Sequence, residues 1–183
     1  HTSCLSDWSS DVCSSDLVVG MAPVGPYLVA FKRSKAFVIY DLDTGANRPI
    51  SANVGLISPN GFVSTPYGLF FVGFDGIYQT NGNRVERVSD KMRPLWDLLP
   101  DTAKSQAAMA YWDDRVFVRF PGSGRTWELD LTTNSWWVHD WGGTLMVTAN
   151  WGSPKWTLYS LVGGQLWSIM TRDPGTAGLY YDP

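Results

Sequence analysis

The sequence has little cysteine and little histidine. Two of its 183 residues are cysteines, Cys4 and Cys13, and two are histidines, His1 and His139. A structural zinc site needs about four Cys or His ligands at close spacing, and a calcium loop needs a series of oxygen ligands. After the first 17 residues only His139 remains of these two residue types. The sequence therefore predicts no metal site, and no cysteine after residue 17 indicates a redox compartment.

The chain also has no long hydrophobic run and no large excess of charge of either sign. None of its apolar runs approaches the roughly 20 residues that span a bilayer as a helix. It has 14 basic and 17 acidic residues, for a formal net charge of −3. Such a balance gives no electrostatic footprint for nucleic acid or an anionic membrane. We expect no nucleic-acid partner and no membrane partner.

The first 17 residues differ in composition from the rest. Residues 7–17, DWSSDVCSSDL, resemble the in-frame translation of a common short-read sequencing adapter. We therefore predict that residues 1–17 are an adapter-derived artefact, disordered and without function, and exclude them from fold reasoning. They carry three of the acidic residues, so the remainder is neutral. Residues 18–183 are predicted to form one β-propeller-like domain, which is either a fragment of a larger protein or a chain that a partner completes.

Aromatic residues and glycine are abundant, with 10 Trp, 8 Tyr, 8 Phe and 18 Gly. From Tyr27 onward, short β-branched or aromatic runs alternate with Gly, Asn, Asp and Pro, which is typical of strands joined by tight turns. In RTWELDL (residues 125–131), apolar and polar residues alternate as in a strand with one buried face. The short links predict antiparallel neighbours. The sequence thus predicts an all-β antiparallel meander.

One segment has helical rather than strand periodicity. In SDKMRPLWDLLP (residues 89–100), Met92, Leu95, Trp96 and Leu99 recur at the spacing of one helix face, after Ser89 as a candidate N-cap. We predict one short amphipathic helix, at about residues 89–99, that packs against a sheet.

A weak internal repeat is also present. VIYDLDTGANRPIS, GIYQTNGNRVERVS and WELDLTTNSWWVHD share the plan of an apolar strand, a polar turn and a second strand. Their spacing is near the roughly 40–50 residues of propeller-blade repeats. We predict partial β-propeller-like blades. Four units or fewer are too few for most closed propellers, so either the chain is a fragment or a partner chain completes the ring.

The segment GLISPNGFVSTPYGLFFVGFDGIYQTNGNRVERVSDKMRPLW (residues 55–96) resembles β-propeller-type virion structural proteins of tailed bacteriophages, namely tail or head–tail stabilisation proteins. The downstream segment AAMAYWDDRVFVRFPG…RTWELDLTTNSWW is similar to the next blade of that family. The matching residues in the first segment are Ser58, Pro59, Thr65, Pro66, Gly68, Leu69, Phe71, Asp75, Gly76, Ile77, Tyr78, Gly82, Val85, Val88, Ser89 and Trp96.

The resemblance implies a non-enzymatic virion protein, assembled in the bacterial host cytoplasm, that packs against other virion proteins and forms a homo-oligomer in the particle. ELDLTTNSWW (residues 128–137) also resembles the edge of a Kelch-type blade. The alternative is therefore a Kelch-like or lectin-like module that binds glycans or proteins.

Several patterns that suggest chemistry have simpler explanations. His139 and Asp140 are adjacent on a predicted strand, so their side chains point to opposite faces, and we expect a surface or turn histidine. Asp41 and Asp43 fit a turn cap, and PGSGRT (residues 121–126) fits a hairpin turn instead of a phosphate loop. The two glutamates, Glu86 and Glu128, alternate with apolar neighbours and are predicted to face solvent. We predict no catalytic residue and no cofactor.

Tryptophans are the best candidates for function. Trp136 and Trp137 are adjacent on a predicted strand, so both cannot face inward, and at least one should be exposed. Exposed tryptophans mark protein interfaces or platforms on which sugars stack. The candidates for either role are Trp136, Trp137, Trp141 and Trp151.

Overall fold

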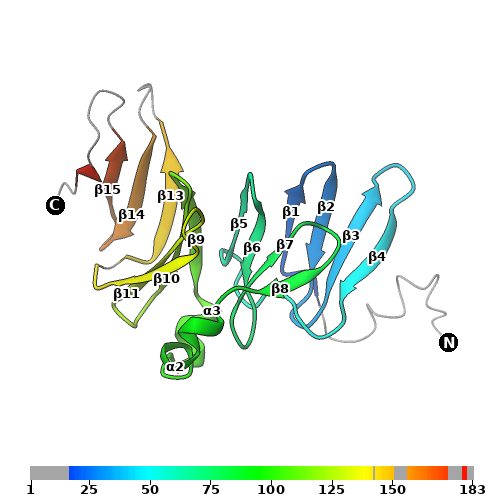
Figure 1. Ribbon diagram of the computed structural model, residues 1–183, viewed down its shortest axis with the longest axis horizontal. Helices are drawn as coiled ribbons and strands as arrows, with labels where there is room; N and C mark the ends of the chain where they lie inside the picture. Colours follow the sequence, from blue (N-terminus) through cyan, green and yellow to red (C-terminus); the bar gives the residue numbers. More distant parts are fainter. Residues whose placement is uncertain (1–16, 142, 151–155, 173–178, 181–183) are drawn as a thin grey trace.

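The computed structural model describes residues 17–141, 143–150, 156–172 and 179–180. The predicted adapter-derived segment lies outside these ranges except for Leu17. The described chain contains four antiparallel sheets of four strands each, side by side in chain order (Figure 1). The first two sheets contain β1 (Gly20–Val24), β2 (Tyr27–Phe31), β3 (Ala36–Asp41), β4 (Ala46–Ser51), β5 (Phe62–Thr65), β6 (Gly68–Val72), β7 (Ile77–Thr80) and β8 (Val85–Arg87). The last two contain β9 (Ala108–Trp112), β10 (Arg115–Phe120), β11 (Arg125–Asp130), β12 (Ser135–His139), β13 (Leu145–Ala149), β14 (Thr157–Val162), β15 (Gln165–Arg172) and β16 (Leu179–Tyr180).

Every sheet is a simple meander in which each strand pairs with the next one along the chain. This confirms the predicted all-β antiparallel fold. The β9–β10 turn uses Asp113 and Asp114 at φ of 50° and 58°, as a two-residue hairpin turn requires. In the β3–β4 turn, Asp41 Oδ1 accepts hydrogen bonds from the Asp43 and Thr44 amides at 3.0 and 3.3 Å, so Asp41 is the predicted turn cap.

The β11–β12 turn of the third sheet repeats this device. Asp130 Oδ1 accepts hydrogen bonds from the amides of Thr132 and Thr133 at 2.9 and 3.0 Å. The same position in two sheets therefore carries the same local structure, which is the physical basis of the sequence repeat.

Strand β1 was not expected from the sequence. Its residues, GMAPV, include a glycine and a proline and form no β-branched run. Proline has no amide donor and is tolerated at sheet edges. Pro23 lies on β1, which is an edge strand paired only with β2. The tertiary pairing thus creates a strand from a sequence with weak intrinsic preference.

The predicted helix at 89–99 is divided in the structure. A 3-10 turn, η1 (Asp90–Met92), leads into α2 (Arg93–Trp96), and a second helix, α3 (Asp101–Ser105), follows. Pro100 disfavours helical conformation at the residue before it, and the chain turns there with the Leu99 amide bonded to the Trp96 carbonyl at 3.1 Å. The predicted apolar face is nevertheless correct, since Met92, Trp96 and Leu99 are all buried.

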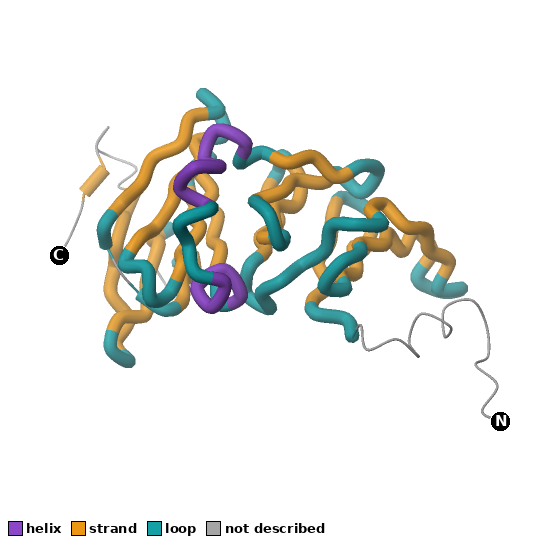
Figure 2. The backbone as a smooth tube through the Cα atoms, turned by 90° about the horizontal axis from the view of Figure 1, so that it is seen from below, coloured by secondary structure: helices purple, strands orange, loops and turns teal. Residues whose placement is uncertain are grey.

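Each pair of successive sheets encloses its own apolar core. The first core lies between sheets one and two, the second between sheets two and three, and the third between sheets three and four. The helical connection lies between the second and third sheets (Figure 2) and contributes Met92, Trp96, Leu99 and Ala103 to the second core. The first strands of the four sheets also contact one another in series, β1 with β5, β5 with β9 and β9 with β13. The sheets therefore stack face to face while their first strands converge.

Candidate interaction surfaces

The adjacent tryptophans of β12 point to opposite sides of the third sheet. Trp136 is partly buried and packs edge-on against Trp127, with ring centroids 6.3 Å apart, and its Nε1 donates to the Val88 carbonyl at 3.2 Å. Trp137 is 59% exposed. Trp136 therefore belongs to the second core, while Trp137 is accessible to a partner. Trp151 lies outside the described residues.

Trp141 lies beside His139 on the side of the third sheet that faces the fourth. It is partly buried against the third core, and its ring is 5.5 Å from the His139 ring at an angle of 33°. The register places Trp137 directly opposite Glu128 on β11. Trp137, His139 and Glu128 thus share one sheet face beside Trp141, and we call these four residues the third-sheet aromatic site.

The prediction that Glu128 faces solvent was wrong. Its side chain is only 6% exposed, with Oε1 at 3.2 Å from Arg115 Nη1 and Oε2 at 2.7 Å from His139 Nε2. The reason is that the third sheet is covered on both faces, so an alternating strand buries its polar residues as well. Glu86 keeps its predicted exposure, at 53%, in an ion pair with Arg84.

His139 is a partly covered histidine, 27% exposed, and not a freely exposed one. Its Nε2 is committed to Glu128, so the pair holds the imidazole in one orientation. A buried carboxylate, an oriented imidazole and an exposed indole can hydrogen-bond a polar ligand and stack against its apolar side.

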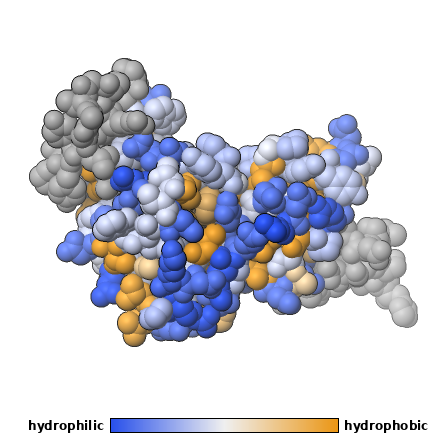
Figure 3. Space-filling view, viewed as in Figure 1, coloured by the Kyte–Doolittle hydropathy of each residue, from blue (hydrophilic) through white to orange (hydrophobic). Residues whose placement is uncertain are grey.

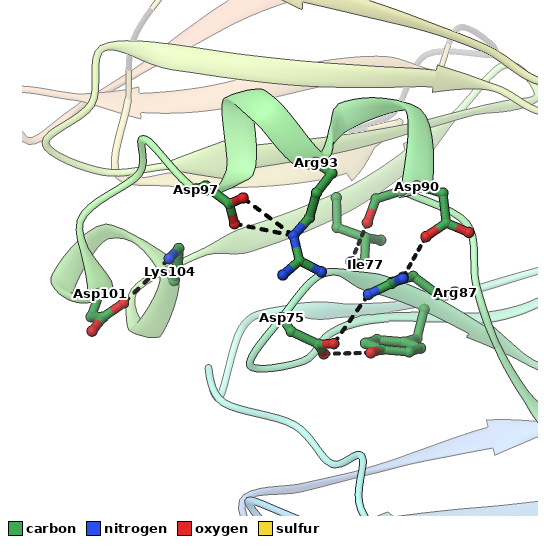
Figure 4. A network of polar contacts seen from close by, with 10 residues as sticks. Asp75, Ile77, Arg87, Asp90, Arg93, Asp97, Asp101 and Lys104 are labelled. Carbon is green, nitrogen blue, oxygen red and sulfur yellow. Dashed lines mark hydrogen bonds and ion pairs between the residues drawn. The ribbon is translucent and has the colours of Figure 1, made fainter.

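The motif Asp75-Gly76-Ile77-Tyr78, central to the phage resemblance, belongs to a network of hydrogen bonds and ion pairs. Figure 4 shows Asp75 and Asp90 on either side of Arg87, whose guanidinium bonds both, at 3.1 and 2.5 Å. The Tyr78 hydroxyl donates to Asp75, and the Ile77 amide donates to Ser89 Oγ at 2.9 Å. These contacts fasten the β6–β7 turn to the end of β8 and to η1.

Position 76 of this network requires a glycine. A Cβ at Gly76 would lie 2.7 Å from Ser89 Oγ and 2.9 Å from Arg87 Cδ. The motif residues of the resemblance thus have a stabilising role that explains their spacing.

Three ionisable side chains with shifted pKa values also serve the fold. Burial and the bond to Asp75 raise the pKa of Tyr78. Burial and the bond to Asp114 raise the pKa of Tyr111 to about 12. Burial lowers the pKa of Arg119, whose guanidinium bonds the Gly143 and Arg125 carbonyls. Each of these groups fixes a turn or a contact between sheets.

A cleft of about 610 Å³ opens between the β2–β3 turn, the segment 53–57, the β6–β7 turn and α3. Its polar lining includes Asp75, Asp101 and Lys104, and Lys104 Nζ is 3.3 Å from Asp101 Oδ1. Phe74 stands at its margin, 73% exposed. Arg33 lines the cleft as well, so two basic and two acidic side chains balance each other's formal charge there.

The outer face of the first sheet is apolar. Residues paired across its strands share a face, and those opposite the first core are mostly hydrophobic. One charge adjoins them, since Lys32 Nζ lies 5.6 Å from the centroid of the Phe37 ring. Met21 is 55% exposed and Leu28, Phe37 and Ile39 are partly exposed. We define the first outer face by Met21, Pro23, Leu28, Phe37, Ile39 and Pro49.

The fourth sheet has a matching outer face. Met146 and Leu158 are buried toward the third sheet, so their neighbours along the strands point away from it. Leu145, Val147 and Leu166 are 38%, 41% and 43% exposed, and Leu161 lies between them. We define the fourth outer face by Leu145, Val147, Leu161 and Leu166. Elsewhere, in the view of Figure 3, hydrophobic residues form small patches between hydrophilic ones.

Sequence reasoning missed both outer faces, although a signal was present. YLVAF (Tyr27–Phe31) is apolar without alternation, and a continuous apolar strand is typical of a sheet covered on both sides. Within the described residues, the first sheet has that type of strand but one neighbouring sheet.

Among the described residues, no group of three His, Cys, Asp or Glu side chains is arranged to hold a metal ion. Within the same residues, none of the helices has the length and apolarity to cross a bilayer.

The stack of four-stranded meanders with converging first strands defines a β-propeller-like protein. The chain is similar to the β-propeller domain of Myceliophteria thermophila Cps50 (Swd1), at 10% identity over 91% of this chain and 56% of that one, with a TM-score of 0.52. It also resembles the computationally designed Ika8 protein (13% identity, 83% of this chain and 46% of that one, TM-score 0.49) and the WD40 domain of Neurospora crassa Pan2 (9%, 97% and 64%, TM-score 0.47).

The chain thus spans less than two thirds of the length of each of these proteins. No protein-family model matches the sequence, and neither does any curated protein. The comparisons therefore define the fold of the chain, and its role is proposed below.

Proposed function

We propose that the chain is a non-enzymatic structural subunit of a bacteriophage tail or head–tail apparatus, which assembles in the host cytoplasm and acts through protein–protein contacts. The observation that carries the proposal is the pair of apolar outer faces on the two end sheets. Monomeric soluble proteins rarely leave large contiguous apolar surfaces exposed, and such surfaces mark interaction sites. The phage resemblance of residues 55–96 supplies the kind of assembly.

The geometry of the titratable groups favours the non-enzymatic alternative. Glu128 and His139 bind each other, and Arg115 holds the second carboxylate oxygen. Asp75 is bonded to Tyr78 and Arg87. Ion-pair networks of this kind also occur as purely structural elements, and we assign these groups that role.

The genes that flank the coding sequence provide the first test. Portal, tail-tube or other virion genes on either side are expected, and an operon of metabolic genes would contradict a virion role. The second test measures binding of the purified chain to the purified products of those virion genes by calorimetry. We expect an interaction that weakens when Val147→Arg alters the fourth outer face and persists in Leu98→Arg, because Leu98 is 76% exposed on the helical connection.

The third-sheet aromatic site favours a second candidate, a lectin-like module that binds glycans. Trp137 presents its indole next to the hydrogen-bonding groups of Glu128 and His139. A glycan array would test this reading, with Trp137→Ala as the variant and Trp156→Ala as the matched control, since Trp156 is 54% exposed at another place. Glycan binding that is lost only in Trp137→Ala would support the lectin reading over the virion one.

A further inference from the structure

All three apolar cores follow one pattern, in which a sheet packs against the next sheet along the chain. The second and third sheets each turn one face toward the sheet before and the other face toward the sheet after. The first sheet, for example, turns Val29 and Phe31 toward Phe71 of the second. The second sheet in turn turns Phe70 and Val72 toward the third.

The outer faces of the end sheets are the two halves of one more contact of this kind. The first outer face is the side that would meet a preceding sheet, and the fourth outer face is the side that would meet a following sheet. Both are apolar like the faces in the three existing cores. They lie at opposite ends of the stack (Figure 1), so one chain in this arrangement does not cover them with each other.

We propose that a second copy of this chain covers both faces, with the first outer face of each copy packed on the fourth outer face of the other. The contact joins different surfaces of the two copies, and such head-to-tail contacts produce a ring when the rotation closes. This inference rests on the proposed function and specifies its partner.

The number of sheets supports two copies. The described residues form four sheets with the fold of a β-propeller domain, so two copies place eight sheets in one ring, within the roughly 4–8 blades of known propellers. In such a ring, β1 of one copy lies beside β13 of the other, as β1 lies beside β5 within the chain.

The test is the molar mass of the purified full chain, measured by size-exclusion chromatography with light scattering across a wide range of concentration. We expect twice the mass of the chain. Met21→Arg and Val147→Arg should each halve that mass, because each places an unpaired charge in both contacts of the ring. Leu98→Arg is the control and should keep the mass of wild type. Circular dichroism should show that the variants remain folded.

Two further samples establish which faces touch. The double variant Met21→Arg, Val147→Glu sets opposite charges across each contact and should recover the doubled mass. Mixing the two single variants should recover part of it, since one of the two contacts is then unaltered. If Val147→Arg has no effect while Met21→Arg does, a symmetric contact between two first outer faces replaces our proposal.

A wild-type monomer at all concentrations would overturn the inference, as would stepwise growth beyond two copies. A monomer indicates that further sheets of a longer chain or another protein cover these faces. A monomer that still binds a flanking virion protein would contradict only the two-copy ring. A doubled mass without any such binding would contradict only the virion role.

Discussion

The two glutamates allow one prediction with a built-in control, because they are alike in the sequence and different in the structure. Glu128 is 6% exposed and lies between Arg115 and His139, whereas Glu86 is 53% exposed and pairs only with Arg84. We expect Glu128→Ala to destabilise the fold strongly and Glu86→Ala to have little effect.

The magnitude follows from the partners that remain. Removal of one member of a buried ion pair costs about 3–5 kcal/mol. Arg115 and His139 are 24% and 27% exposed and recover some hydration after the truncation, so we expect a cost of about 2–3 kcal/mol. An exposed pair such as Glu86–Arg84 contributes about 0–1 kcal/mol.

Thermal unfolding followed by circular dichroism measures both effects. For a chain of this size, 1 kcal/mol lowers the midpoint by about 2–4 °C. Glu128→Ala should therefore lower it by about 4–12 °C and Glu86→Ala by less than about 4 °C. Glu128→Gln keeps most of the volume and separates the loss of charge from the loss of packing. Equal midpoints for Glu128→Ala and Glu86→Ala would refute the buried ion cluster.

Two further predictions concern packing and pH. Gly55→Ala should lower the free energy of unfolding in urea by about 3 kcal/mol, because its Cβ would lie 2.1 Å from the Lys32 carbonyl oxygen. Gly45→Ala, in open space at φ +69°, should lower it by about 1 kcal/mol. Equal losses in the two variants would contradict the close approach at Gly55. Hydrogen bonds from threonine hydroxyls and turn amides hold the pKa values of Asp41 and Asp130 below the ordinary 3.8. Their stabilisation is thus complete above that value and is lost as pH falls through the folded-state pKa. The melting temperature of the double variant Asp41→Asn, Asp130→Asn should therefore fall less steeply than that of wild type as pH drops below 3.8. Equally steep declines would contradict the role of these two carboxylates as turn caps.

Much of the fold could be predicted from the sequence because strand and turn signals are local. A two-residue alternation or an Asp-Asp turn depends on neighbouring residues, and these signals identified most of the strands and the meander. Strand β1 was missed because its residues have weak strand preference and only pairing with β2 makes it a strand. The helix was predicted too long, since regular helix ends at Trp96 and the chain turns before Pro100, which disfavours helical conformation at the residue before it.

The candidate sites were less predictable because they depend on which sheet faces are covered. The exposure of one of the two β12 tryptophans follows from alternation alone, and the structure assigns it to Trp137. The burial of Glu128 depends on the fourth sheet, which is distant in sequence from β11. A polar residue on an alternating strand looks the same whether solvent or another sheet faces it.

The sequence by itself determined the secondary structure, the direction of the strands and the repeated turns, since these depend on backbone preferences within a few residues. Only the tertiary structure decided which faces of the sheets meet, which charges are buried together and which apolar faces remain without a neighbour. The physical reason is that burial is a property of contacts between sheets, and those contacts join residues that are far apart along the chain.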